Sequence, residues 1–216
     1  MGQKTISFLK TQNRDFNNII DSSLNLTDGG TVVGATTLSG TTKLTGNTGL
    51  SAGSGFSDAA TYRSWVEYLG TVVKTSVYID LTGIRSTAAN DIIGNDGAAS
   101  ANIGQYTTAV MGTMNGVVMT CLETPTGGDP DINLAFADEA TLAEDSALSA
   151  GTNGGTILNN GDIAAGTSYA AGNAGLPAAD QYLYLVAGAA TDADYTAGVL
   201  HLKFYGTTDT ANVRQA

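Results

Sequence analysis

A six-residue pattern of apolar and small residues runs from Val32 to Gly53. Each repeat opens with an apolar residue, and glycine follows two positions later in the first repeats. Side chains alternate between the two faces of a strand, so a repeat of even length keeps each of its positions on one face. The pattern therefore predicts an extended β thread over residues 31–56. Its apolar positions are Val32, Leu38, Leu44 and Leu50.

The thread cannot bury these apolar positions by itself. One large apolar residue in six is too few to form a core, and stacked repeats need neighbours that cover their apolar face. The simplest neighbour is another copy of the same chain. We therefore predict a symmetric homo-oligomer, most simply a homotrimer, in which the apolar positions of all copies meet on a common axis. The trimerisation residues would be Val32, Leu38, Leu44 and Leu50.

The segment before the thread, residues 1–30, carries apolar residues at helical spacing. Phe16, Ile19, Ile20 and Leu24 predict a short amphipathic helix. A small helix ahead of a thread suits an arm that docks on a partner. The docking residues would be Phe8, Phe16, Ile19 and Ile20. The alternative is that this face packs on the chain's own C-terminal domain, because apolar faces are more often buried than left for a partner.

Aromatic residues cluster shortly after the glycine-rich end of the thread. Tyr62, Trp65, Tyr68 and Leu69 recur at helical spacing, which predicts one or two helical turns with these side chains on one face. We expect the cluster to seal one end of the following domain, since aromatic side chains dominate cores by buried area. The other interpretation is a surface on which a ligand stacks.

From Gly70 onward, short apolar segments alternate with turn signals. The candidate strands are residues 71–81, 102–111, 117–123, 132–137, 156–158, 181–187 and 199–205. Asn115-Gly116, between two apolar segments, is the best hairpin signal in the chain. Short strands without alternating helices predict an all-β domain over residues 57–216, a β-sandwich with jelly-roll connections as one variant, rather than a barrel. The order of the strands cannot be read from the sequence.

Composition agrees with an all-β chain and narrows the range of partners. Gly contributes 28 of 216 residues and only 13% of residues are charged, which suits short strands joined by tight turns. The formal net charge of −11 argues against a nucleic-acid partner, because that binding depends on Lys and Arg. No long apolar window and no leader-like N-terminus occur, so we expect no membrane insertion and folding in a cytoplasm.

Signals for chemistry are weak along the whole sequence. His201, the only histidine, lies in an alternating strand segment and is expected to face solvent or another subunit. Cys121, the only cysteine, has apolar neighbours, which predicts a buried and inert thiol. The acidic pairs in turn-rich segments are Asp129/Asp131, Asp138/Glu139, Glu144/Asp145 and Asp192/Asp194. We interpret them as solvated turns, with a calcium site as the alternative. We therefore expect no enzyme, no cofactor and no metal site.

Several segments resemble those of tailed-bacteriophage virion structural proteins. They are Lys4-Thr5-Ile6-Ser7-Phe8-Leu9-Lys10, residues 14–22, the hexad repeats, residues 182–188 and residues 191–198. The resemblance covers most of the chain, and its motifs are compositional. It implies an N-terminal attachment segment, a Gly/Thr-rich repeat and a compact β domain, in a component of the virion.

Two positions in a virion fit this organisation. A short arm, a thread of four hexads and one β domain favour a trimeric capsid decoration or cement protein, whose partners would be its own copies and the major capsid protein. The alternative is a tail-fibre or baseplate component whose C-terminal domain binds a receptor glycan through Trp65 or exposed tyrosines. An enzyme that acts on host polysaccharide ranks last, because no pair of catalytic carboxylates is indicated.

Overall fold

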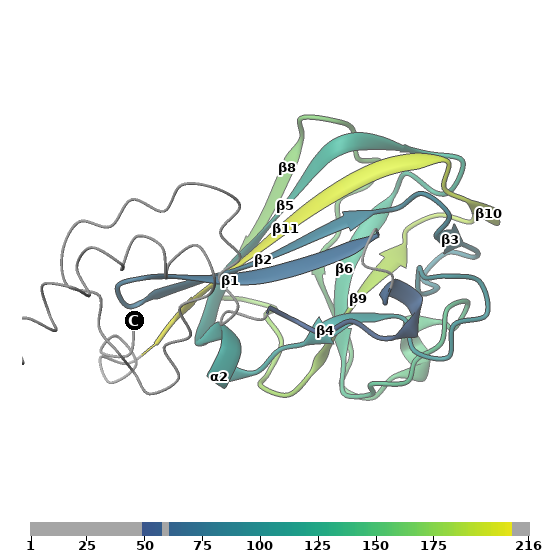
Figure 1. Ribbon diagram of the computed structural model, residues 1–216. Helices are drawn as coiled ribbons and strands as arrows, with labels where there is room; N and C mark the ends of the chain where they lie inside the picture. Colours follow the sequence, from purple (N-terminus) through teal and green to yellow (C-terminus); the bar gives the residue numbers. More distant parts are fainter. Residues whose placement is uncertain (1–48, 58–60, 209–216) are drawn as a thin grey trace, which may run out of the picture. The chain divides into compact units, whose positions relative to one another are not determined.

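The computed structural model describes residues 49–57 and 61–208 (Figure 1). The chain divides into two units, Met1–Lys43 and Leu44–Ala216, and all described residues belong to the second. The predicted docking residues Phe8, Phe16, Ile19 and Ile20 lie outside the described residues, as do Val32, Leu38 and Leu44 of the predicted trimer axis. The account below therefore concerns the C-terminal domain.

The strands of this domain form two main antiparallel sheets. The five-stranded sheet has the order β1 (Tyr62–Leu69), β2 (Val72–Asp80), β11 (Ala197–Thr207), β5 (Thr113–Thr126) and β8 (Ser168–Gly172). The four-stranded sheet has the order β4 (Asn102–Gln105), β9 (Tyr182–Ala187), β6 (Ile132–Ala137) and β7 (Gly155–Leu158). A small third sheet pairs β10 (Ala193–Asp194) with β3 (Arg85–Ser86).

Helical segments are short within the described part of the chain. They are η1 (Ser54–Phe56), α2 (Thr108–Met111) and η2 (Leu148–Ala150). The prediction of an all-β domain is therefore confirmed. Six of the predicted strands are present: β6 has its predicted ends, and β2, β5, β7, β9 and β11 have adjusted ends.

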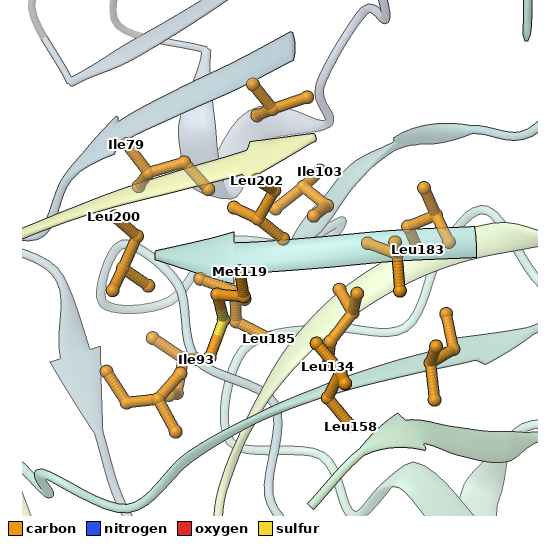
Figure 2. Close-up of a cluster of buried hydrophobic side chains, with 14 of the residues drawn as sticks. Ile79, Ile93, Ile103, Met119, Leu134, Leu158, Leu183, Leu185, Leu200 and Leu202 are labelled. Carbon is orange, nitrogen blue, oxygen red and sulfur yellow. The ribbon is translucent and has the colours of Figure 1, made fainter. Parts of the chain in front are cut away.

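One hydrophobic core lies between the two main sheets. Figure 2 shows Ile79, Met119, Leu200 and Leu202 of the five-stranded sheet close to Leu134, Leu158, Leu183 and Leu185 of the four-stranded sheet. Alternate residues of β2 and β11 enter this core, so the intervening residues of these strands face away from it. The two sheets thus pack face to face, and the five-stranded sheet keeps a face that the core does not use.

The aromatic segment Tyr62–Leu69 is strand β1, so the prediction of helical turns there is wrong. It pairs with β2 along its whole length, from Tyr62 opposite Ile79 to Leu69 opposite Val72. Gly70, with φ of +65°, makes the tight turn between the two strands. In a strand, side chains that are three positions apart point to opposite faces, so the helical spacing has no meaning there. Pairing with the neighbouring strand decided the conformation of this segment.

Asn115-Gly116 does not form the hairpin that its sequence predicts. Both residues lie inside β5, and Gly116 is paired with Tyr205 of β11. The register shifts at the next step, where Gly206 lies opposite Met114, so the glycine accompanies a bulge. The predicted strand over 102–111 also differs, because it divides into β4 and the single turn α2.

The end of the predicted thread belongs to the β domain. Leu50 is 7% exposed and packs in the main core, and its N–H donates to Ser64 Oγ at 2.8 Å. The N–H of Gly53 donates to the Asn102 carbonyl at 2.9 Å. Tyr62 Oη donates to the Ile103 carbonyl at 2.7 Å and lies 3.3 Å from the Leu50 carbonyl. Leu50 is thus covered by its own chain, which differs from its predicted place on a trimer axis.

Candidate functional site: an aromatic hollow on the open sheet face

The outward face of the five-stranded sheet carries aromatic and charged side chains over three neighbouring strands. The pairing of β1, β2 and β11 places Arg63 beside Tyr78, and Tyr78 beside His201. The next row along these strands consists of Trp65, Ser76 and Lys203. Both rows alternate with core residues, so they form one continuous surface on the side of the sheet away from the core.

A hollow of about 340 Å³ opens on this surface between β1 and β2. Its lining residues are Arg63, Trp65, Tyr78 and Asp80. Each strand contributes two residues that are two positions apart, which spaces them by about 7 Å along the strand. Arg63 and Tyr78 lie directly opposite each other in the middle of the hollow, whereas Trp65 and Asp80 lie toward its two ends, opposite Ser76 and Thr61.

Trp65 is held in place by its neighbours on the sheet. Its indole contacts the imidazole of His201, with ring centroids 5.7 Å apart and planes tilted by 31°. The contact is diagonal across β2, because Trp65 lies opposite Ser76, whereas His201 lies opposite Tyr78. Ser76 is fully buried although it is on the outward row, and its Oγ has no hydrogen-bond partner among the described residues. Trp65 nevertheless remains 37% exposed, so its indole is fixed and still accessible.

Two opposite charges lie at the hollow. Asp80 Oδ1 accepts a hydrogen bond from the backbone N–H of Thr82 at 3.0 Å, which fixes the orientation of the carboxylate. Arg63 forms no ion pair with any residue that the structure describes. No described residue engages the donors of its guanidinium, so they can bind a ligand. The hollow offers an aromatic platform together with one cation and one anion.

The surroundings of the hollow are also charged. Lys74 Nζ lies 2.5 Å from Glu67 Oε2 on the neighbouring row, and this hydrogen bond lowers the pKa of the Glu67 carboxyl. Burial lowers the pKa of the His201 imidazole, and the charges of Lys203 and Lys74 lower it further. His201 lies on the outward face of β11, as its sequence predicted, and its Nε2 has no hydrogen-bond partner in the described ranges.

A second hollow, of about 470 Å³, brings together acidic residues that are distant in the sequence. Its charged lining residues are Arg85, Asp96, Glu144, Asp145 and Asp192. Arg85 Nη2 lies 2.6 Å from Asp192 Oδ1, and this ion pair ties β3 to the segment before β10. Burial raises the pKa of the Glu144 carboxyl, and the charges of Asp145 and Asp96 act in the same direction.

The other predicted acidic pairs have structural contacts. Asp129 is buried, and its two carboxylate oxygens accept from the backbone N–H groups of Asp131 and Ala189. Asp138 and Glu139 accept hydrogen bonds from Asn153 and Thr152. No group of three or more His, Cys, Asp or Glu residues in the described ranges has an arrangement that could hold a metal ion.

Cys121 is buried in the core between the sheets, as its apolar neighbours predicted. Burial raises the pKa of its thiol, which keeps the sulfur protonated and unreactive at neutral pH. Tyr78, Arg63 and Asp80 were not singled out by the sequence. The alternation of Ser76, Tyr78 and Asp80 is a usable signal, but the spacing of the aromatic residues predicts helical turns where β1 lies, so the sequence pattern does not predict the hollow.

Comparison of the chain with protein-family models, with curated proteins and with solved structures gave no match. Among the helices that the structure describes, none is long and apolar enough to cross a membrane. Because no relative was found, we interpret the hollow from its own residues. Trp65 can stack against a ring, and Arg63 and Asp80 can form hydrogen bonds with hydroxyl groups.

Proposed function

We propose that this chain is a virion structural protein of a tailed bacteriophage, a trimeric capsid decoration or cement protein that binds the outside of the shell. The observation that carries the proposal is the junction between the repeat and the β domain. The last hexad is fixed to the domain through Leu50 in the core and the Gly53–Asn102 backbone hydrogen bond. A thread joined in this way would leave Val32, Leu38 and Leu44 for the assembly axis, with the β domain attached directly to its end.

The order of the parts along the chain supports attachment by the N-terminal arm. Residues 1–30 would dock on neighbouring copies of the major capsid protein through Phe8, Phe16, Ile19 and Ile20. The thread would join the copies through Val32, Leu38 and Leu44, and the β domains would face outward. A trimer that docks with several arms dissociates only when all contacts open together, so modest contacts gain strength through effective concentration.

The test is binding of the purified full-length chain to capsids that lack it. The Ile20→Asp variant should lose capsid binding at least tenfold, because it places a charge on the predicted docking face. The Leu44→Asp variant should dissociate the trimer, because it gathers like charges on the predicted axis. Capsid occupancy is measured by quantitative gel analysis after sedimentation, and the mass of the free protein by light scattering.

Each variant has a matched control in the neighbouring sequence. Asn18→Asp adds the same charge to the arm away from the predicted apolar face, and Thr45→Asp adds it to the opposite face of the thread. Both controls should bind and assemble normally. If Leu44→Asp leaves the mass unchanged, the axial thread is refuted; if the unaltered protein does not bind capsids, the capsid position is refuted.

The hollow on the open sheet face favours a second candidate function. An exposed, fixed Trp65 with Tyr78 beside it suits a receptor-binding domain of a tail fibre or baseplate component, in which the β domain would contact a host glycan. Labelling of complete virions with an antibody against this domain separates the two positions. Label over the shell supports decoration, and label confined to the tail supports the fibre.

A further inference from the structure

We propose that the hollow lined by Arg63, Trp65, Tyr78 and Asp80 binds a neutral pyranose sugar at the end of a glycan chain. The inference rests on the glycan-binding candidate function above and deepens it by naming the class of sugar. The site itself does not depend on whether the chain is attached to the capsid or to the tail. Three features of the hollow carry the inference: the platform, the pair of charges and the fixed geometry.

The platform fits the apolar face of a sugar. A pyranose ring has one side rich in C–H groups, and the negative face of an aromatic ring attracts such groups. Trp65 exposes 37% of its surface on a face of the sheet that the core does not use. Tyr78 lines the same hollow from the next strand, so a second aromatic group borders the ring. A solvent-exposed indole with no part in the core is available for this contact.

The charges fit the polar rim of a sugar. Hydroxyl groups both donate and accept hydrogen bonds, so they can bridge a carboxylate and a guanidinium. Asp80 supplies acceptors, and Arg63 supplies donors that no described residue engages. The pair has no net charge, and the whole chain carries −11. An acidic sugar would meet repulsion from Asp80, and Arg63 and Asp80 together give the lining no net charge, so a neutral sugar matches the lining best.

The hollow is prepared for binding before a ligand arrives. Trp65 is held against His201 at 5.7 Å, and Asp80 is fixed by the Thr82 N–H at 3.0 Å. Side chains that are already ordered lose little conformational entropy when a ligand binds. Because one sugar covers only one indole face, we expect a dissociation constant on the order of millimolar for a monosaccharide, which several copies in an oligomer would strengthen by avidity.

The test uses the intrinsic fluorescence of the full-length chain, in which Trp65 is the only tryptophan. The methyl glycosides of glucose, galactose, mannose and N-acetylglucosamine are titrated to about 50 mM, beyond the expected millimolar range. At least one should shift and saturate the Trp65 emission, since stacking removes water from the indole. Methyl glucuronide, of similar shape but with a carboxylate, should bind at least threefold more weakly than the glucoside.

Variants are compared by saturation-transfer NMR with the best glycoside, which needs no tryptophan. Trp65→Ala should reduce binding more than tenfold. Asp80→Asn should reduce it about threefold to tenfold, because the amide retains the oxygen that accepts from Thr82 but loses the charge. Tyr68→Ala is the matched control, since Tyr68 is on the same strand and is 42% exposed but does not line the hollow. It should bind like the parent protein.

Failure of this inference is distinguishable from failure of the proposed capsid function. No saturable change with any of the glycosides overturns the sugar site, and so does an equal loss of binding in Trp65→Ala and Tyr68→Ala. The sugar site is also overturned if the Trp65 emission shifts with protein concentration but not with any glycoside, because another copy of the chain would then cover the hollow. Capsid binding of Trp65→Ala should remain normal in each case, because the proposed docking residues lie in the arm.

Discussion

The two main sheets of the domain share a core, but their outward faces differ in how far other segments cover them. The outward face of the four-stranded sheet is buried beneath long connections. Ala135, Ala137, Tyr184 and Val186 lie on it in a second hydrophobic cluster with Ile92 and Leu142. The outward face of the five-stranded sheet has no such cover among the described residues, and it carries Lys74, Tyr78, His201 and Lys203 instead.

The sequences of the strands record this difference. In β9 every residue from Leu183 to Ala187 is buried, so the strand is a continuous apolar run. In β11 buried and half-buried residues alternate from Ala197 to Gly206. Strands buried on both faces are apolar throughout, whereas strands with one wet face alternate. A fold that covers one sheet completely leaves the open face of the other free to carry binding residues at little cost to stability.

The connections that cover the four-stranded sheet are attached by specific hydrogen bonds. Tyr184 is fully buried, and its Oη donates to the backbone carbonyl of Glu139. The backbone N–H of Ala101 donates to the Leu142 carbonyl at 2.9 Å, and the N–H of Ile92 donates to the Ser146 carbonyl at 2.9 Å. These contacts make the segments before β4 and after β6 one layer over the sheet.

The largest expected effect on stability comes from replacing one tyrosine on each outward face with alanine. Tyr184→Ala should lower the free energy of unfolding by about 3–5 kcal/mol, because it leaves a cavity under the covering layer. Tyr78→Ala, on the open face, should cost about 1 kcal/mol or less. Urea denaturation at equal conditions measures both. Equal losses of unfolding free energy would mean that side chains on the open face stabilise the domain as much as those on the covered face. The contrast between the two sheets would then be refuted.

A smaller effect is expected at the junction of the thread with the domain. Leu50→Ala should lower the free energy of unfolding by about 2–3 kcal/mol, because Leu50 fills part of the core beside Gly104. The mass of the native protein should stay unchanged, as measured by light scattering. Ser51→Ala, at an exposed neighbour, is the control and should be nearly neutral. A change of mass without loss of stability would return Leu50 to an intersubunit axis.

The smallest expected effect concerns the charge of Glu144 in the covering layer. Glu144 is 6% exposed, Oε2 accepts from the Gly97 N–H at 3.2 Å, and Oε1 has no partner among the described residues. Its pKa is raised by burial, so its protonated form is favoured in the folded state. The stabilisation is complete below the unfolded pKa of 4.5 and is lost as pH rises through the higher folded pKa.

Glu144→Gln should therefore be more stable than the parent protein at pH 7, by about 0.5–1 kcal/mol, because an amide is cheaper to bury than a carboxylate. The difference should vanish as pH falls below 4.5, where Glu144 is neutral in both states. Urea denaturation at pH 7 and pH 4 measures it, and carboxyls common to both proteins cancel. A difference that is the same at both pH values would show that burial of the charge is not its cause.

Alternation and composition by themselves determined the all-β class and most of the strands. β6 was predicted with its observed ends, and β2, β9 and β11 within a few residues, because each has the apolar period of a strand next to a core. The burial of Cys121 and the outward position of His201 also follow from local sequence. These properties depend on side-chain hydrophobicity along one strand, which the sequence contains directly.

Only the tertiary structure decided β1, the bulge at Gly116 and the place of Leu50. Residues 62–69 fit helical spacing, but pairing with β2 satisfies their backbone groups in a sheet. Gly116 has the sequence of a turn, but its register with Tyr205 keeps it inside a strand. The hollow depends on the same pairing: Arg63 and Trp65 meet Tyr78 and Asp80 only because residues 62–69 form a strand whose register with β2 is set by the turn at Gly70.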